Sequence, residues 1–123
     1  MRGTSRTEAG RARIEAAGFE GVVADPDRLG TLLPHLQGAS VLCWLMGTAG
    51  DPALRGERFA SLLELLVDTH VRGVVYEAPQ AGDTAQRASE TYRMPVALIA
   101  APPDDPSPWL RDALGAVDAV LAA

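Results

Sequence analysis

Hydrophobic positions along the chain form short apolar runs separated by longer stretches with helical spacing. The runs 21–24, 73–78 and 95–101 are rich in Val and Ala, and 39–46 (ASVLCWLM) is almost continuously apolar. A continuous apolar run is typical of a central parallel strand buried on both faces. Residues 2–6 form a further, more polar strand candidate. The pattern therefore predicts five strands.

The stretches between these runs have the spacing of amphipathic helices. The clearest is 54–69, where Phe59, Leu62, Leu63, Leu66 and Val67 share one face. Gly18 stands where a C′ glycine closes a helix, and Asp25 is an N-cap candidate before Pro26. Further helices are predicted at 7–17, from Asp83 or Thr84 to Tyr92 and from Pro108 onward with Ser107 as cap, while Pro34 divides 29–36 into short helical pieces.

Strands that alternate with helices predict right-handed βαβ crossovers. We therefore expect an α/β fold, a three-layer αβα arrangement with a mainly parallel five-stranded sheet, in a single domain over residues 1–123. Ligands of such folds bind beyond the carboxyl ends of the strands. The residues that follow each strand are the candidates for a functional site.

Charge and composition exclude several functions. The formal net charge is −5, which is not that of a nucleic-acid-binding protein. The sequence contains no lysine, so a P-loop lysine, a Schiff-base lysine and a Tyr-x-x-x-Lys pair are all excluded. Four arginines against one acid in residues 1–13 mark either an anion site or a solvated helix face.

Cys43, His35 and His70 give no metal-binding pattern. Cys43 lies in an apolar run and is expected to be a small buried side chain. No apolar run reaches the length of a membrane span, and no signal-peptide pattern opens the chain, so a cytoplasmic location without membrane attachment is expected.

Two strand ends carry candidate chemistry. Thr4, Ser5 and Arg6 lead through Thr7 into a predicted helix, and a hydroxyl-rich turn at a helix N-terminus binds anions. The alternative is a capped helix with an exposed arginine. Tyr76 and Glu77 lie at the tip of the fourth strand, where a carboxylate is a candidate acid or base without an identifiable titratable partner.

Several strand ends together resemble a known family. The ends of its successive elements are similar to four segments of this chain, which are Thr4-Ser5-Arg6, Ala24-Asp25, Leu36-Gln37-Gly38 and Met46-Gly47. The family is the atypical short-chain dehydrogenases, the NAD(P)-dependent epimerase-like group. The segments VRGVVYEAP and YRMPVALIAAP resemble that family's fifth and sixth strands. The resemblance covers nearly the whole chain.

The resemblance implies a Rossmann-like fold and NADP, or NAD, as cofactor. It places Arg6, with Thr4 and Ser5 beside it, at the 2′-phosphate, Asp25 at the adenine amino group, and Met46 and Gly47 beside the adenine ribose. An enzyme of this kind would be an oxidoreductase or epimerase-like protein.

The chain also departs from the family. The first strand, the G-x-G-x-x-G loop, the first helix and the Tyr-x-x-x-Lys pair are absent, so the chain is expected to be an N-terminally truncated Rossmann-like domain. Removing strand 1 from the order 3-2-1-4-5-6 leaves the flavodoxin-like order 2-1-3-4-5. Three explanations stay open. The five strands form one continuous sheet, another chain completes the sheet, or the protein starts further upstream.

Two functions follow from these observations. One is NAD(P) binding by a Rossmann-like protein or fragment without the standard catalytic residues. The other is a non-enzymatic α/β interaction module, including a homo-oligomer that covers the gap in the sheet.

Overall fold

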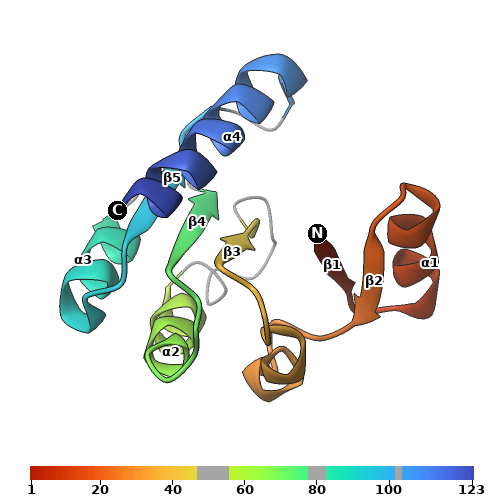
Figure 1. The fold of residues 1–123 in the computed structure, drawn as a ribbon, viewed down its shortest axis with the longest axis horizontal. Helices are drawn as coiled ribbons and strands as arrows, with labels where there is room; N and C mark the ends of the chain where they lie inside the picture. Colours follow the sequence, from red (N-terminus) through yellow and green to blue (C-terminus); the bar gives the residue numbers. More distant parts are fainter. Residues whose placement is uncertain (47–55, 78–82, 102–103) are drawn as a thin grey trace. The chain divides into compact units, whose positions relative to one another are not determined.

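Every strand pairing among the described residues is parallel. The computed structural model describes residues 1–46, 56–77, 83–101 and 104–123, and the chain divides into two compact units, Met1–Gln37 and Gly38–Ala123. In the first unit, β1 (Arg2–Ser5) pairs with β2 (Glu20–Val23). In the second, β4 (Gly73–Glu77) lies between β3 (Val41–Trp44) and β5 (Val96–Ile99) (Figure 1).

In the first unit, helix α1 (Glu8–Ala16) connects β1 to β2 and packs on both strands. It ends as predicted at Gly18, whose φ is +93°. The Gly18 amide donates to the Glu15 carbonyl at 3.0 Å and the Phe19 amide to the Ile14 carbonyl at 3.3 Å. This Schellman motif satisfies the last carbonyls of the helix and turns the chain into β2.

Two short 3₁₀ turns follow β2. They are η1 (Leu29–Thr31) and η2 (Leu33–His35), and they confirm the short helical pieces expected around Pro34. The predicted N-cap at Asp25 is wrong, because the residue before η1 is Arg28. The Asp25 carboxylate instead accepts a hydrogen bond from the amide of Asp27, which makes an Asx turn.

The second unit has helices on both faces of its sheet. Phe59 of α2 (Glu57–Leu66) packs edge-on against Tyr76 of β4, with ring centroids 4.5 Å apart. On the other face, Val75 and Ile99 form a buried cluster with Ala116 and Val120 of α4 (Pro106–Ala122). Helix α3 (Asp83–Tyr92) packs beside α2. The unit is therefore layered as expected for an αβα fold (Figure 1).

The α/β class with parallel strands is confirmed. A single five-stranded sheet of order 2-1-3-4-5 stays a prediction, as does a single domain, because the strands are described as one sheet of two and one of three. The run 39–46 was predicted to be a strand buried on both faces, and this prediction is wrong. The strand buried in this way is β4, all of whose residues are buried. Cys43, in β3, is exposed, so the expected burial of its side chain is wrong.

Helix α4 begins two residues before the predicted Pro108. Asp105 takes the N-cap position and Pro106 the first helical position, so Ser107 is inside the helix and the predicted Ser107 cap is wrong. Proline fits the first turn because its fixed φ is helical and its missing N–H would have no intrahelical acceptor there. No helix in the described ranges is long and apolar enough to cross a membrane.

A close backbone approach at the start of β4 gives the first prediction. A Cβ on Gly73 would lie 2.8 Å from the Pro95 carbonyl oxygen and 2.5 Å from Val120 Cγ1. Because a backbone atom cannot move aside cheaply, Gly73→Ala should lower the free energy of unfolding by about 1–3 kcal/mol. Urea denaturation followed by circular dichroism measures the change.

Gly115 provides the matched control. It lies inside α4 with no atom within 4 Å of its added Cβ. Gly115→Ala should raise the free energy of unfolding by about 0.5–1 kcal/mol, since alanine favours a helix interior. Equal effects of the two substitutions would contradict the packing described at Gly73.

Candidate functional site

Predicted site residues meet at the carboxyl end of the β1–β2 pair. In the parallel register Ser5 lies opposite Val23, and the ladder continues with the Ala24 amide donating to the Ser5 carbonyl at 2.9 Å. Arg6 follows Ser5 directly, and Asp25 follows Ala24, one residue beyond the position level with Arg6. The strand register thus brings together residues that are 19 positions apart in the sequence.

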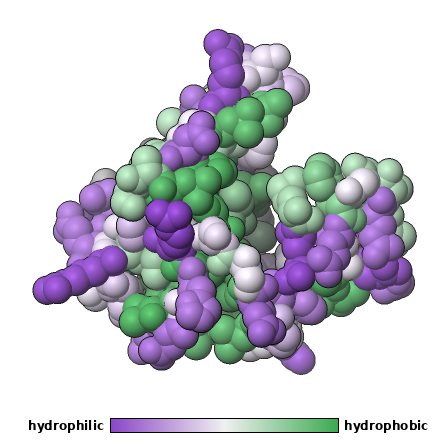
Figure 2. All heavy atoms as spheres, in the orientation of Figure 1, coloured by the Kyte–Doolittle hydropathy of each residue, from purple (hydrophilic) through white to green (hydrophobic). Residues whose placement is uncertain are grey.

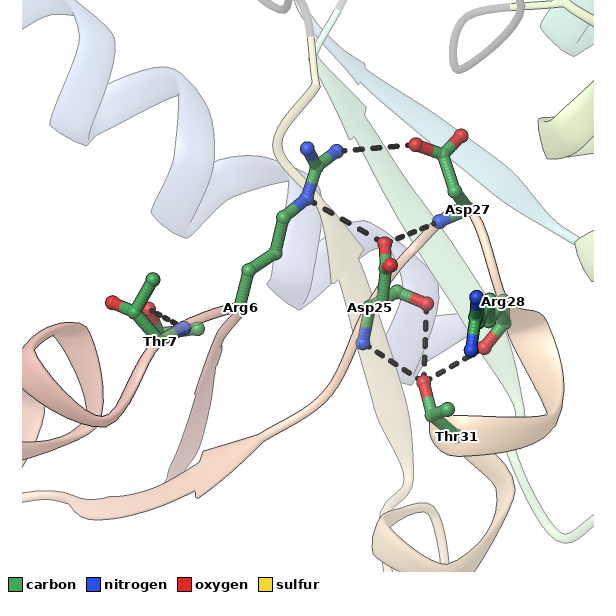
Figure 3. Close-up of polar contacts among 7 residues, drawn as sticks. Arg6, Thr7, Asp25, Asp27, Arg28 and Thr31 are labelled. Carbon is green, nitrogen blue, oxygen red and sulfur yellow. Dashed lines mark hydrogen bonds and ion pairs between the residues drawn. The ribbon is translucent and has the colours of Figure 1, made fainter.

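Arg6 lies between two carboxylates (Figure 3). Its Nε is 3.5 Å from Asp25 Oδ1, and one terminal guanidinium nitrogen is 3.6 Å from Asp27 Oδ2. The Arg6 side chain is still 53% exposed, against 38% for Asp25. These long, partly exposed ion pairs position the guanidinium at the sheet edge while leaving it accessible to solvent and solutes.

The loop after β2 is fixed by its own hydrogen bonds. The Asp27 amide donates to Asp25 Oδ1 at 2.9 Å, and the Asp25 amide donates to Thr31 Oγ1 at 2.8 Å (Figure 3). The Thr31 hydroxyl lies 2.7 Å from the Arg28 carbonyl oxygen, to which it can donate. Both carboxylates are therefore presented to Arg6 by a turn that is held at several points.

On the other side of Arg6, the chain enters α1 through a capped N-terminus. Thr7 is the N-cap, and its hydroxyl accepts a hydrogen bond from the Gly10 amide at 3.1 Å. The Ser5 hydroxyl accepts one from the Thr7 amide at 3.3 Å. A side chain at Gly10 would overlap the Ser5 hydroxyl, so glycine allows α1 to lie against the end of β1.

Carboxylates also pair with two other arginines of the first unit. Arg2 is 3.1 Å from Glu20, and Arg11 pairs with both Glu8 and Glu15. The hydrogen bond from Arg11 lowers the pKa of Glu8, and the hydrogen bond to Glu8 raises the pKa of Arg11. Residues 1–37 contain five arginines and five carboxylates, so the net charge of −5 lies in residues 38–123.

The two candidates at the end of β4 point to opposite faces of the sheet. Tyr76 is 3% exposed and packs against Phe59 on the α2 face. Glu77 is 5% exposed on the α4 face, where Trp109 Nε1 donates to its Oε2 at 2.9 Å. The structure therefore does not bring Tyr76 and Glu77 together as a catalytic pair.

The other predicted residues are more scattered. Thr4 is exposed on β1, and Met46 is half-buried just after β3 in the second unit. Gly47 lies outside the described residues. No group of three or more His, Cys, Asp or Glu side chains in the described part of the chain is placed to hold a metal ion.

Sequence reasoning missed three residues of these clusters. Asp27 and Thr31 were not predicted because apolar periodicity carries no information on the hydrogen bonds of a loop. The Asp-x-Asp spacing is nevertheless a turn signal. Trp109 was expected only as an apolar residue of the last helix. The same side chain also carries an indole N–H, which is a hydrogen-bond donor, and the N–H of a buried indole is usually bonded to an acceptor.

The parallel strands, helical crossovers and polar strand ends together define a Rossmann-like α/β fold. No protein-family model matches the sequence, and no curated protein matches it. Among solved structures, the chain is similar to the Citrobacter sp. triphenylmethane reductase complexed with NADP(H), with a TM-score of 0.63 and 18% sequence identity. The match covers 80% of this chain and 38% of the reductase chain, and at this identity it shows the fold.

The Trp109–Glu77 hydrogen bond gives a second prediction. Trp109→Phe removes the donor while Glu77 stays buried, so the free energy of unfolding should fall by about 1.5–3 kcal/mol. In the Glu77→Gln background the acceptor is neutral, and the same Trp109→Phe change should cost only about 1 kcal/mol. Urea denaturation of the four proteins measures the difference, and equal costs in both backgrounds would show that the carboxylate charge is irrelevant.

Proposed function

We propose that this chain binds a dinucleotide of the NADP type at the carboxyl end of β1, with Arg6 at the 2′-phosphate. The supporting observation is the position of Arg6, directly after a parallel strand, before the capped N-terminus of α1 and 53% exposed. Strand ends of this kind are where Rossmann-like folds bind their ligands. The triphenylmethane reductase to which this chain is similar was solved as a complex with NADP(H).

The chemistry of the site suits a phosphate monoester beside an adenosine. A guanidinium offers several N–H donors in a plane that matches phosphate oxygens. Thr4, Ser5 and Thr7 add hydroxyl groups, and the N-terminus of α1 adds a positive dipole end. Asp25 supplies an acceptor for the adenine amino group, while Met46 and Gly47 stay candidates beside the ribose.

The same geometry limits the affinity. Asp25 and Asp27 both lie near Arg6, so an incoming phosphate competes with two carboxylates for one guanidinium. The contacts proposed for these residues all lie at this edge of the sheet. The proposal is a binding function; Tyr76 and Glu77 remain weak candidates for any catalytic step.

Arg6→Ala should separate NADPH from NADH. Loss of a charged hydrogen bond to the 2′-phosphate should weaken NADPH binding between about tenfold and a hundredfold and leave NADH binding nearly unchanged. Isothermal titration calorimetry at fixed, low salt measures both affinities. Arg2→Ala is the matched control, because Arg2 is also ion-paired but lies at the opposite end of β1. Equal losses for NADPH and NADH would refute the 2′-phosphate contact.

Asp27→Asn should strengthen NADPH binding. The substitution keeps the shape of the side chain but removes one negative charge 3.6 Å from Arg6, so NADPH affinity should rise about two- to fivefold. NADH affinity should stay the same. The matched control is Glu20→Gln, which removes an arginine-paired carboxylate at the far end of β2. A fall in NADPH affinity with Asp27→Asn would mean that Asp27 helps to hold the nucleotide.

A specific observation also favours the second candidate function, an α/β interaction module. Helix α4 exposes large apolar side chains beside the face that packs on the sheet. A homo-oligomer assembled through that helix is compatible with nucleotide binding at β1, so the two proposals do not exclude each other.

A further inference from the structure

Helix α4 has two apolar faces. One face packs on the sheet through Trp109, Ala113, Ala116 and Val120. An adjoining side, turned about 100° around the helix from these residues, carries Leu110, Leu114 and Leu121, which are 54%, 59% and 40% exposed. In Figure 2 hydrophobic residues can be followed along the part of the molecule that α4 occupies in Figure 1, with hydrophilic residues beside them. We call Leu110, Leu114 and Leu121 the outer stripe.

The outer stripe has the spacing of a helix-packing seam. Its residues stand at i, i+4 and i+11, and Val117, half-buried because it also packs against the sheet-side cluster, fills the i+7 position. This 4-3-4 spacing is that of the a and d positions of a coiled coil, and it keeps the side chains in line along about 16 Å of helix. Contiguous apolar surface of this kind marks an interaction site, whereas single exposed leucines do not.

We propose that a second copy of this chain covers the outer stripe, with the two α4 helices packed antiparallel. The stripe reads nearly the same in both directions about its midpoint, so an antiparallel pair places Leu110 opposite Leu121 and Leu114 opposite Val117 of the second copy. A two-fold axis at that midpoint makes the same patch serve both partners, as a closed dimer requires.

The charges beside the stripe select the antiparallel direction. Arg111 and Asp118 are exposed, two helical turns apart and on the same flank of the outer stripe. In the antiparallel pair, Arg111 of each copy approaches Asp118 of the other, which gives two opposite-charge pairs. A parallel pair would instead place this flank of the two copies on opposite sides of the seam, where Arg111 and Asp118 have no charged partner from the same flank of the second copy. Charge complementarity therefore fits a second copy in one orientation.

The experiment is to measure the mass of the full chain in solution by light scattering over a wide concentration series. One helix face is smaller than a standard protein interface, so the dimer should dissociate on dilution. The expected mass at high concentration is twice the 12.9 kDa of one chain. Leu114→Arg should abolish the dimer, whereas Val67→Arg, at a residue equally exposed on another element, should leave it intact.

Charge exchange tests the orientation separately from the folding of α4. Arg111→Asp should raise the dissociation constant of the dimer about tenfold, and adding Asp118→Arg should restore it. A monomer at every concentration, a dimer that survives Leu114→Arg, or a dimer unaffected by Arg111→Asp would each overturn the proposal. Circular dichroism of each variant confirms that α4 is folded.

Discussion

Parallel strand pairing is the constraint on which both units depend. Two parallel strands cannot be joined by a tight turn, so the chain must cross over through α1 between β1 and β2, and through α2 and α3 around β4. The same rule brings the carboxyl ends of paired strands to one edge. Arg6 and Asp25 meet there because Ser5 and Val23 are paired in register. The candidate site is therefore a direct consequence of the backbone topology.

Elements with purely local causes were predictable from the sequence. Gly18 closes α1 through a motif that needs only a residue with positive φ and two neighbouring carbonyl groups. The apolar face of α2 is buried from Phe59 to Leu66 as its spacing indicates, but the placement of Val67 on that face is wrong, because the helix ends at Leu66 and Val67 is 54% exposed. The start of α4 was misplaced by two residues because Ser107 and Asp105 are both acceptable N-caps. Both are followed by a proline that suits the first helical position, and the structure uses the earlier pair, Asp105 and Pro106.

The candidate site was predictable in position but not in its interactions. That Arg6 and Asp25 both follow strands was enough to place them at one edge, and the structure brings them within ion-pair distance. That Arg6 also meets Asp27 depends on the Asx turn and on Thr31, six residues beyond Asp25. The contact between Trp109 and Glu77 spans 32 residues and requires α4 to cover one particular face of β4. Such contacts need the crossover geometry, which periodicity alone does not contain.

Charge distribution decides how each surface of the molecule can function. Residues 1–37 are formally neutral and residues 38–123 carry the whole excess of −5, so an anionic ligand gains nothing from the overall field and depends on local donors. Arg6 is such a donor, because its pairing with Asp25 and Asp27 leaves it half exposed. The negative second unit would also repel a second copy at long range. An association through α4 therefore needs short-range apolar contact. Salt screens both this repulsion and the Arg111–Asp118 pairs, so the apolar contact has to hold the two copies together when charges are screened.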